Sequence, residues 1–451
     1  MNLPLFRYVL SAALTLLTLV PAVNAADARP NFLIIFADDL GYGDVSTYHK
    51  SDVATPHFDR LAAQGMTFTS MRANCTVCSP SRAALLTGRY PDRVGVPGVI
   101  RTQPENSWGY LAPSVPTLAT ELKQAGYRTA IVGKWHLGLE SPNTPNQRGF
   151  DHFHGFLGDM MDSYTTHLRH GVNYMRLNDQ PIEPKGHATD LFTTWAQEYL
   201  QQQAGADEPF FLYLAYNAPH FPIQPPADWL AKVKQEQPHL DEKRAANVAF
   251  VQHLDDAVGR VLKTLDDAGL AENTVVVFCS DNGGSLPHAQ NNDPWRDGKQ
   301  SHYDGGLKVP FFVRWPAQVK AGSYSDYAGL NFDVFPTFLE LAGRHPSDQL
   351  DAVSLLPILE GKPAFHARPR DLYFVRREGG LRYGGKDYQA LVRGDWKLMQ
   401  NDPYSPLELY NLREDPQEQN NLVQKAPKIY REMANALRRQ IQAAGNVPWR
   451  K

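Results

Sequence analysis

The chain has 451 residues, of which 42% are hydrophobic and 21% are charged, and its formal net charge is -3. Lysine and arginine residues are scattered along the sequence, which argues against nucleic acid or an anionic membrane surface as a partner. Three cysteines are too few for a disulfide framework, so stability must come from the sizeable core that a chain of this length can bury.

The N-terminus has the three parts of a secretory signal peptide. Arg7 precedes an apolar run from Tyr8 to Val20, and small residues ending in Ala25 follow it. The run has 13 residues, whereas a membrane-spanning helix needs roughly 20. We therefore expect residues 1–25 to be cleaved, and the mature protein to be soluble, without a membrane span, and periplasmic or secreted.

Short apolar, β-branched or aromatic runs alternate with amphipathic helical patterns over the next part of the chain. The expected strands are Asn31–Ala37, Thr129–Val132, Pro209–Tyr216, Thr274–Cys279 and Pro310–Arg314, and helical patterns include Thr117–Ala125 and Ala245–Ala268. Continuously apolar strands belong to sheets that helices cover on both faces. The sequence predicts an α/β catalytic domain over residues 26–357, with a large, mostly parallel sheet.

The pattern changes after Pro357. Short strand patterns with polar turns run over Leu372–Arg376, Tyr388–Arg393, Trp396–Gln400 and Leu407–Tyr410, and a helical pattern covers Ile429–Ala444. This order predicts a smaller C-terminal α+β subdomain over residues 358–451, built from an antiparallel sheet and a helix.

Polar residues follow four of the expected strands at the point where each strand ends. They are Asp38-Asp39, the segment from Gly133 to His136, the segment from Asn217 to His220, and the segment from Ser280 to Gly284. In open α/β sheets, ligands bind beyond the carboxyl ends of the strands. Each motif alone also fits a turn or a packing residue, so their convergence is what indicates a site.

Three carboxylates and one amide among these residues form an oxygen-only set: Asp38, Asp39, Asp281 and Asn282. Such ligands suit Ca²⁺ or Mg²⁺ rather than zinc. We expect Ca²⁺, because an exported protein meets it at the higher concentration.

The stretch NCTVCSPSRAALLTGRYP contains two of the cysteines, three positions apart. Cys75 and Cys78 could form a redox pair, but the first cysteine of such a pair is exposed at a helix start and has a lowered pKa. Here Cys78-Ser79 fits the cap position of a helix that Gly88 ends. Cys78 would then lie where backbone N–H groups attract an anion, with Arg82 one turn further on.

The segment Cys78-Ser79-Pro80-Ser81-Arg82 resembles the CxPSR signature of the formylglycine-dependent (type I) sulfatases, within the alkaline phosphatase superfamily. Further blocks are similar to those of the family and stand in the same order: Ala37–Asp44, Gly133–Gly138, Ser280–Gly283 and Gly298–Gly306. The resemblance extends from about Arg29 to the Asp415-Pro416 region.

The resemblance implies an alkaline-phosphatase-like fold and the hydrolysis of sulfate esters. By that resemblance, Cys78 is converted to 3-oxoalanine (formylglycine) by a sulfatase-maturing enzyme, and this residue completes a Ca²⁺ site made by Asp38, Asp39, Asp281 and Asn282. Arg82 and Lys134 match residues that hold the formylglycine and neutralise sulfate charge. His136 matches the base that regenerates the aldehyde. His220 and Lys299 match sulfate contacts, one of which protonates the leaving alcohol.

Several features are less defined. Asp162 and Ser163 follow a block, Gly149–Gly158, after which some relatives place a substrate contact, and either residue could be structural. A polar cluster, comprising His152, His154, His167, Arg169 and His170, either lines a sugar subsite or forms a solvated loop. Cys75 and Cys279 have no assigned role.

The leading interpretation is therefore a calcium-dependent sulfatase that acts on a sulfated small molecule or saccharide. A phosphonate monoester or phosphodiester hydrolase of the same superfamily is the nearest alternative. Alternatives of other classes are a thiol-disulfide oxidoreductase that uses Cys75 and Cys78, and a non-catalytic sulfoglycan-binding protein. The sugar, the sulfated position, exo or endo action and the oligomeric state stay open at this point.

Overall fold

The computed structural model describes residues 29–50, 52–362, 370–379, 386–445 and 447–449. The expected signal peptide at residues 1–25 lies outside this range. Within the described residues, none of the helices combines the length and the apolar character that crossing a membrane requires.

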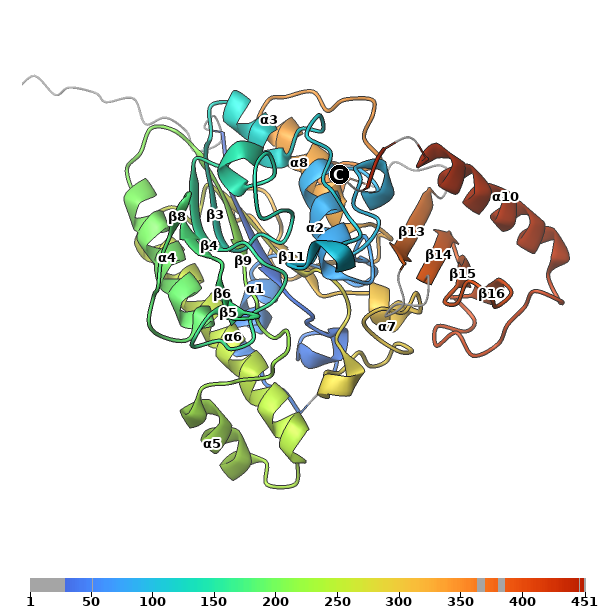
Figure 1. The fold of residues 1–451 in the computed structure, drawn as a ribbon, viewed down its shortest axis with the longest axis horizontal. Coiled ribbons are helices and arrows are strands. Elements are labelled where there is room, and N and C mark those ends of the chain that lie inside the picture. The colour runs from blue at the N-terminus through green and yellow to red at the C-terminus, as the bar shows by residue number, and fades with distance from the viewer. Residues whose placement is uncertain (1–28, 51, 363–369, 380–385, 446, 450–451) are drawn as a thin grey trace, which may run out of the picture.

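A ten-stranded sheet forms the centre of the larger part of the molecule (Figure 1). Its order is β12 (Ser323–Ser325), β2 (Met66–Phe68), β11 (Phe311–Arg314), β10 (Thr274–Ser280), β1 (Asn31–Ala37), β9 (Phe210–Ala215), β3 (Arg128–Lys134), β4 (His152–Phe156), β7 (Met175–Leu177) and β8 (Gln180–Pro181). The five strands from β10 to β4 run parallel. The five strands expected from the sequence are all present, although β11 runs antiparallel to β10.

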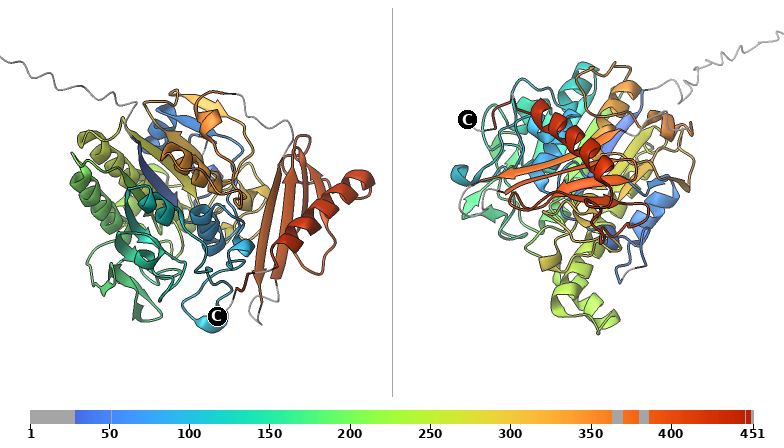
Figure 2. Two further views of the ribbon diagram at one scale, coloured as in Figure 1. Left: turned by 90° about the horizontal axis from the view of Figure 1, so that it is seen from above. Right: turned by 90° about the vertical axis from the view of Figure 1, so that its right-hand side faces the viewer.

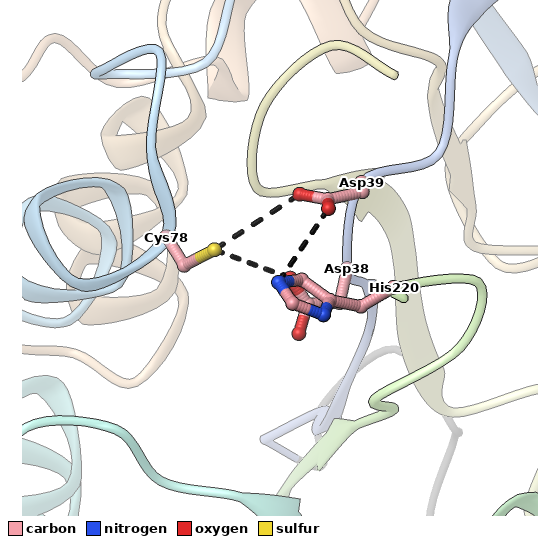
Figure 3. A group of neighbouring side chains, drawn as sticks. All are labelled: Asp38, Asp39, Cys78 and His220. Carbon is pink, nitrogen blue, oxygen red and sulfur yellow. Dashed lines mark hydrogen bonds and ion pairs between the residues drawn. The ribbon is translucent and has the colours of Figure 1, made fainter. Parts of the chain in front are cut away.

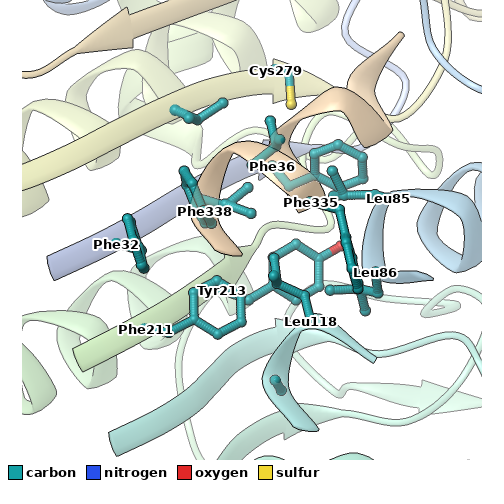
Figure 4. Close-up of a cluster of buried hydrophobic side chains, with 14 of the residues drawn as sticks. Phe32, Phe36, Leu85, Leu86, Leu118, Phe211, Tyr213, Cys279, Phe335 and Phe338 are labelled. Atoms are coloured by element: carbon teal, nitrogen blue, oxygen red, sulfur yellow. The ribbon is translucent and has the colours of Figure 1, made fainter. Parts of the chain in front are cut away.

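Side chains of the central strands alternate between two buried cores. Phe32, Ile34 and Phe36 of β1 join one core, and Leu33 and Ile35 join the other. The first core contains α2 (Cys78–Thr87), α3 (Leu118–Gln124) and α8 (Val334–Leu341), and part of it is drawn in Figure 4. The second contains α1 (Pro56–Ala63), α4 (Ala188–Gln203) and α6 (Glu242–Asp267). Coverage on both faces explains why the strands are apolar at successive positions.

The C-terminal part is a four-stranded antiparallel sheet with one long helix against it. The strands are β13 (Asp371–Glu378), β14 (Lys386–Arg393), β15 (Trp396–Gln400) and β16 (Glu408–Asn411), and the helix is α10 (Pro427–Ala443). Figure 2 shows this sheet between α10 and the rest of the molecule. The predicted fold class, a large α/β part with a smaller antiparallel sheet and helix, is confirmed. The predicted boundary after residue 357 lies inside the short helix α9 (Leu356–Leu359) and stays a prediction.

Short elements complete the described chain. They are the hairpin β5 (Leu168–Arg169) and β6 (Val172–Asn173), and the helices α5 (Ala227–Glu236) and α7 (Asp304–Leu307).

The register of the central strands aligns their carboxyl ends. Ala37 of β1 pairs with Ser280 of β10, and Ala215 of β9 pairs with Gly133 of β3. Because parallel strands share one direction, the residues that follow them leave the sheet at one edge. This alignment brings together the polar segments that the sequence analysis singled out.

Candidate active site

Cys78 is the first residue of helix α2 and is buried. Val77, in an extended conformation, occupies the cap position, where we had expected Cys78-Ser79. The Ser79 hydroxyl accepts a hydrogen bond from the backbone N–H of Ile100 (3.0 Å), so it is used to hold a neighbouring loop. Gly88 ends the helix with a φ of 65°, as the sequence predicts.

Two carboxylates that follow β1 surround the Cys78 sulfur (Figure 3). Its Sγ lies 3.3 Å from Oδ1 of Asp38 and 4.0 Å from Oδ1 of Asp39. Asp39 has a φ of 64°, which is uncommon for a residue with a side chain and costs about 1–3 kcal/mol. Such strain persists only where surrounding contacts enforce it, and it is typical of functional sites.

The segment after β10 adjoins the same carboxylates. The backbone N–H of Asp39 donates to Oδ1 of Asp281 (3.1 Å), and Nδ2 of Asn282 donates to Oδ1 of Asp39 (2.8 Å). Both Asp281 and Asn282 are fully buried. The four predicted oxygen ligands therefore lie in one contiguous cluster.

Two buried cations, from α2 and β3, neutralise part of this charge. Nη2 of Arg82 lies 2.7 Å from Oδ2 of Asp281 and 3.5 Å from Oδ2 of Asp38. Nζ of Lys134 lies 2.5 Å from the same Asp38 oxygen. Burial raises the pKa of Asp38, but Lys134, His220 and Arg82 outweigh burial and hold that pKa well below its usual range.

Lys299 and His220 complete the cluster on the Asp39 side. Nζ of Lys299 lies 2.7 Å from Oδ2 of Asp39 and 3.7 Å from Sγ of Cys78. Nε2 of His220 lies 3.6 Å from Oδ2 of Asp39, while its Nδ1 lies 2.6 Å from the carbonyl oxygen of Phe221.

The donor set fits a divalent metal ion. Asp38, Asp39, Cys78 and His220 can each offer one ligand atom, all within 4.8 Å of one another. Oδ1 of Asn282 is buried and has no hydrogen-bond partner among the described residues, which is the environment that a cation would satisfy. Carboxylate and amide oxygens favour a hard cation.

His136 lies beyond the end of β3 and is suited to accept a proton. Its Nε2 lies 2.7 Å from the carbonyl oxygen of Ile100, so this nitrogen carries the hydrogen, and Nδ1 is buried without a partner among the described residues. Burial, with the charges of Lys134 and Arg82, holds the pKa of His136 well below its usual range. The ring is therefore neutral at pH 7, with a free basic nitrogen.

The other cysteines do not form a redox site. Cys75, Cys78 and Cys279 are buried and unpaired. The thiol of Cys75 donates to the carbonyl oxygen of Val375 (3.2 Å), and burial raises its pKa to about 12. Because thiol-disulfide exchange needs an accessible thiolate, this geometry argues against the oxidoreductase interpretation.

A cleft of about 450 Å³ opens over the cluster. Cys78, His136, His220 and Lys299 line it, together with Arg169 and His170 of the polar cluster noted in the sequence. Further lining residues, which no local motif marks, are Arg101, Asp159, His288 and Arg376.

Asp162 and Ser163 lie next to residues that line the cleft. Asp162 accepts hydrogen bonds from Nη1 of Arg169 (2.8 Å) and from the backbone N–H of His170. Ser163 lies 3.1 Å from the hydroxyl of Thr165. Neither is among the residues that line the cleft, so direct contact with substrate stays a prediction for both.

A large α/β sheet that gathers buried carboxylates, cations and a helix N-terminus at its carboxyl edge defines a hydrolase of the alkaline-phosphatase-like class. A family model described as sulfatase matches residues 30–344, and one described as N-sulphoglucosamine sulphohydrolase, C-terminal, matches residues 294–446. The chain belongs to the sulfatase family, and its activity is the hydrolysis of sulfuric esters.

Individual relatives agree with this assignment. N-acetylgalactosamine-6-sulfatase of Canis lupus familiaris is 35% identical over 377 residues, which cover 78% of this chain and 70% of that protein. N-acetylgalactosamine-6-O-sulfatase of Bacteroides thetaiotaomicron is 29% identical, with 91% and 92% covered. The crystal structure of Ps i-CgsB in complex with k-i-k-neocarrahexaose superposes with a TM-score of 0.85 at 28% identity, and covers 94% of this chain and 95% of that chain.

Proposed function

We propose that this sulfatase removes sulfate esters from a saccharide by means of a nucleophile derived from Cys78. The observation that carries the proposal is the position of the Cys78 Sγ at the start of α2, beside Asp38, Asp39 and Lys299 at the floor of an open cleft. The names of the relatives support a saccharide, because two of them are N-acetylgalactosamine 6-sulfatases and another was crystallised with a neocarrahexaose.

We propose that a maturing enzyme converts Cys78 to formylglycine. As a hydrate, this group supplies two hydroxyls on one carbon, one to attack sulfur and one to release the sulfate afterwards. Arg82 and Lys134 hold the surrounding carboxylates and offset sulfate charge. His136, with its free Nδ1, is the base that receives the proton of the second hydroxyl. Lys299 and His220 adjoin the same position and are the candidates to contact sulfate and protonate the leaving alcohol.

We also propose that Asp38, Asp39, Asp281 and Asn282 hold one Ca²⁺ ion, with the modified residue 78. The formal charges support a divalent ion: when ionised, Asp38, Asp39 and Asp281 carry three negative charges, which oppose the three positive charges of Arg82, Lys134 and Lys299. Burial and the neighbouring Asp38 raise the pKa of Asp281 to about 7, and a bound cation would favour its ionised form. A divalent ion would leave the site with an excess of two positive charges, which suits an anionic sulfate. Calcium is preferred to magnesium because of the proposed export.

Export through cleavage after Ala25 is part of this proposal, as is the division into a catalytic domain over residues 26–357 and a C-terminal subdomain over 358–451. N-terminal sequencing of protein secreted by the native host tests the cleavage site directly, and an intact Met1 would contradict it.

The test of the nucleophile is the mass of the tryptic peptide Ala73–Arg82 from protein made in its native host. We expect Cys78 to have exchanged its sulfur and two hydrogens for one oxygen, and the purified enzyme to release sulfate from p-nitrophenyl sulfate. A free thiol in an active preparation would overturn the formylglycine proposal. Faster hydrolysis of a matched aryl phosphonate ester would favour the phosphonate monoester hydrolase instead.

A further inference from the structure

The C-terminal sheet contributes an arginine to the active-site cleft. Arg376 lies on β13, near the C-terminal end of this strand, and its side chain is 2% exposed. It lines the cleft together with Cys78 and Lys299. Its Nη1 donates to Oε1 of Gln300 (3.1 Å), and Gln300 directly follows Lys299. A guanidinium therefore lies beside the proposed sulfate-contacting residue.

A buried carboxylate holds this arginine and a second one. Nε of Arg376 donates to Oε1 of Glu378 (2.9 Å), and Nη2 of Arg101 donates to Oε2 of the same carboxylate (2.6 Å). Glu378 is 1% exposed; burial raises its pKa, but the two arginines outweigh burial and lower it, so the carboxylate is ionised. Two guanidinium groups and one carboxylate leave one positive charge in excess. We call Arg101, Arg376 and Glu378 the arginine triad.

Arg376 retains a hydrogen-bond donor for a ligand. Its hydrogen bonds to Glu378 and Gln300 use Nε and Nη1, and Nη2 makes none with the described residues. Arg376 is among the residues that line the cleft, although only 2% of its side chain is exposed. The guanidinium is fixed before any ligand arrives, so little side-chain entropy is lost when an anion binds.

The surroundings of Arg169, which also lines the cleft, carry the reverse balance. Arg169 lies 3.0 Å from a carboxylate oxygen of Asp159 and 2.8 Å from one of Asp162, so one cation meets two carboxylates. His170 and His288 also line the cleft. An anion that enters the cleft is therefore attracted to the arginine triad and not to the wall that holds Arg169.

We propose that the arginine triad is a second anion subsite, which binds a sulfate or carboxylate of the saccharide other than the sulfate ester that is cleaved. The proposal rests on the saccharide sulfatase function above. Arginine suits this role because it stays charged and its Nη2 can donate a charge-assisted hydrogen bond to either anion. The preferred substrate then carries two anionic groups, one at Cys78 and one at Arg376.

Competitive inhibition of p-nitrophenyl sulfate hydrolysis tests the subsite without requiring turnover of the sugar. Two matched pairs place a second sulfate on the same ring: N-acetylglucosamine 6-sulfate against glucosamine 2-N,6-O-disulfate, and N-acetylgalactosamine 6-sulfate against its 4,6-disulfate. A third places a carboxylate on the neighbouring ring: N-acetylgalactosamine 6-sulfate with and without a linked hexuronate. We expect at least one dianionic member to inhibit about tenfold more strongly than its monoanionic partner, the effect of one charge-assisted hydrogen bond.

Variants attribute that preference to the triad. Arg376→Gln should reduce the ratio of the two inhibition constants toward one, and Arg376→Lys should restore part of it. Arg101→Gln serves as a second variant if Arg376→Gln does not fold. Arg393→Gln is the matched control, because Arg393 makes two hydrogen bonds to Asp371 in the same sheet and lies outside the cleft.

Three results separate the proposals. If the wild-type protein from its native host does not hydrolyse p-nitrophenyl sulfate, the proposed function itself is overturned. An active wild type whose three pairs inhibit equally would overturn only the subsite. If the ratio of the two inhibition constants is unchanged in both Arg376→Gln and Arg101→Gln, other residues cause the preference, and the subsite is also overturned.

Discussion

Two buried charge clusters in this enzyme differ in one respect that separates catalysis from structure. The first is the cluster that we propose to be catalytic, called the catalytic cluster below, and it comprises Asp38, Asp39, Asp281, Arg82, Lys134 and Lys299. A second cluster, the inter-sheet cluster, joins the large sheet region to the C-terminal sheet and comprises Arg72, Asp304, Lys397 and Glu418. Both lie almost entirely out of contact with solvent.

Ion pairs close the inter-sheet cluster, although Oε1 of Glu418 makes no hydrogen bond with the described residues beyond its ion pair to Lys397. Nη2 of Arg72 lies 2.7 Å from Oδ2 of Asp304, and Nζ of Lys397 lies 2.9 Å from Oδ1 of the same residue. Nζ of Lys397 also lies 2.8 Å from Oε1 of Glu418. Oε2 of Glu418 accepts a hydrogen bond from the backbone N–H of Asp304 (2.7 Å). None of the four lines the active-site cleft. The catalytic cluster instead adjoins the cleft, because Lys299 and the neighbouring Cys78 line it. Buried charge alone therefore does not indicate an active site, whereas buried charge that adjoins a cavity does.

The largest effect should come from the nucleophile position. Cys78→Ala should reduce sulfate release by about 10⁴-fold or more, because no other group can attack sulfur, and should leave the free energy of unfolding nearly unchanged. Sulfate release and urea unfolding are measured on the same preparation. Cys75→Ala is the matched control, since Cys75 is a buried cysteine whose thiol donates to the carbonyl oxygen of Val375 and does not line the cleft, so its loss should leave activity within a few fold. Equal losses of sulfate release in Cys78→Ala and Cys75→Ala would contradict the special role of the Cys78 position.

The inter-sheet cluster should show the opposite behaviour. Lys397→Met leaves two buried carboxylates poorly compensated, so we expect the free energy of unfolding to fall by about 3–5 kcal/mol, while activity per folded molecule is retained. Urea unfolding measures the first quantity and active-site titration the second. Lys263→Met, which breaks the exposed pair with Asp267, should cost less than about 0.5 kcal/mol. A stable but inactive Lys397→Met enzyme would place this cluster in the catalytic machinery.

Metal removal should affect only the catalytic cluster. Ca²⁺ at about one hundred times its dissociation constant should stabilise the protein by about 2.7 kcal/mol relative to the chelated protein. Thermal unfolding with and without a chelator measures this gain, which does not depend on activity. In Asn282→Ala the gain should shrink, because one oxygen ligand is lost, whereas Lys397→Met should retain it. Equal gains in wild type and Asn282→Ala would remove Asn282 from the ligand set.

The smallest effect concerns Lys308, which adjoins the inter-sheet cluster. Its Nζ lies 3.6 Å from the centre of the Trp295 ring, and burial lowers its pKa to about 7, with Asp304 opposing this shift. A lysine whose pKa is lower in the folded than in the unfolded protein lowers the free energy of unfolding, because the unfolded chain binds the proton more tightly. The cost therefore grows as the pH falls from about 10.5 to 7 and is constant below that range.

Lys308→Met should remove this cost and raise the free energy of unfolding at pH 6 by on the order of 1 kcal/mol, with no gain near pH 10.5. Urea unfolding at both pH values checks the sign. A gain of the same size at both would assign the effect to packing and not to the proton.

Local patterns of apolar and polar residues along the sequence determined most of the fold. Runs such as Asn31–Ala37 and Thr274–Cys279 predicted strands because burial on both faces requires apolar side chains at successive positions. The residues after these strands predicted a shared site, because the carboxyl ends of parallel strands meet at one edge. Asp38, Asp281 and Lys134 could be selected in this way, and the CxPSR resemblance added Cys78 and Arg82.

Tertiary structure alone decided what depends on the docking of distant segments. Glu378 could join Arg101 to Arg376 only when β13 packed beside the loop around residue 100, and no periodicity or local motif records that contact. The same holds for Lys397 of β15, which meets Asp304 of α7. Patterns along the chain record the burial of individual residues, whereas ion pairs between remote segments depend on the relative position of whole elements. For this reason the catalytic centre was readable in the sequence, and the proposed second anion subsite required the folded molecule.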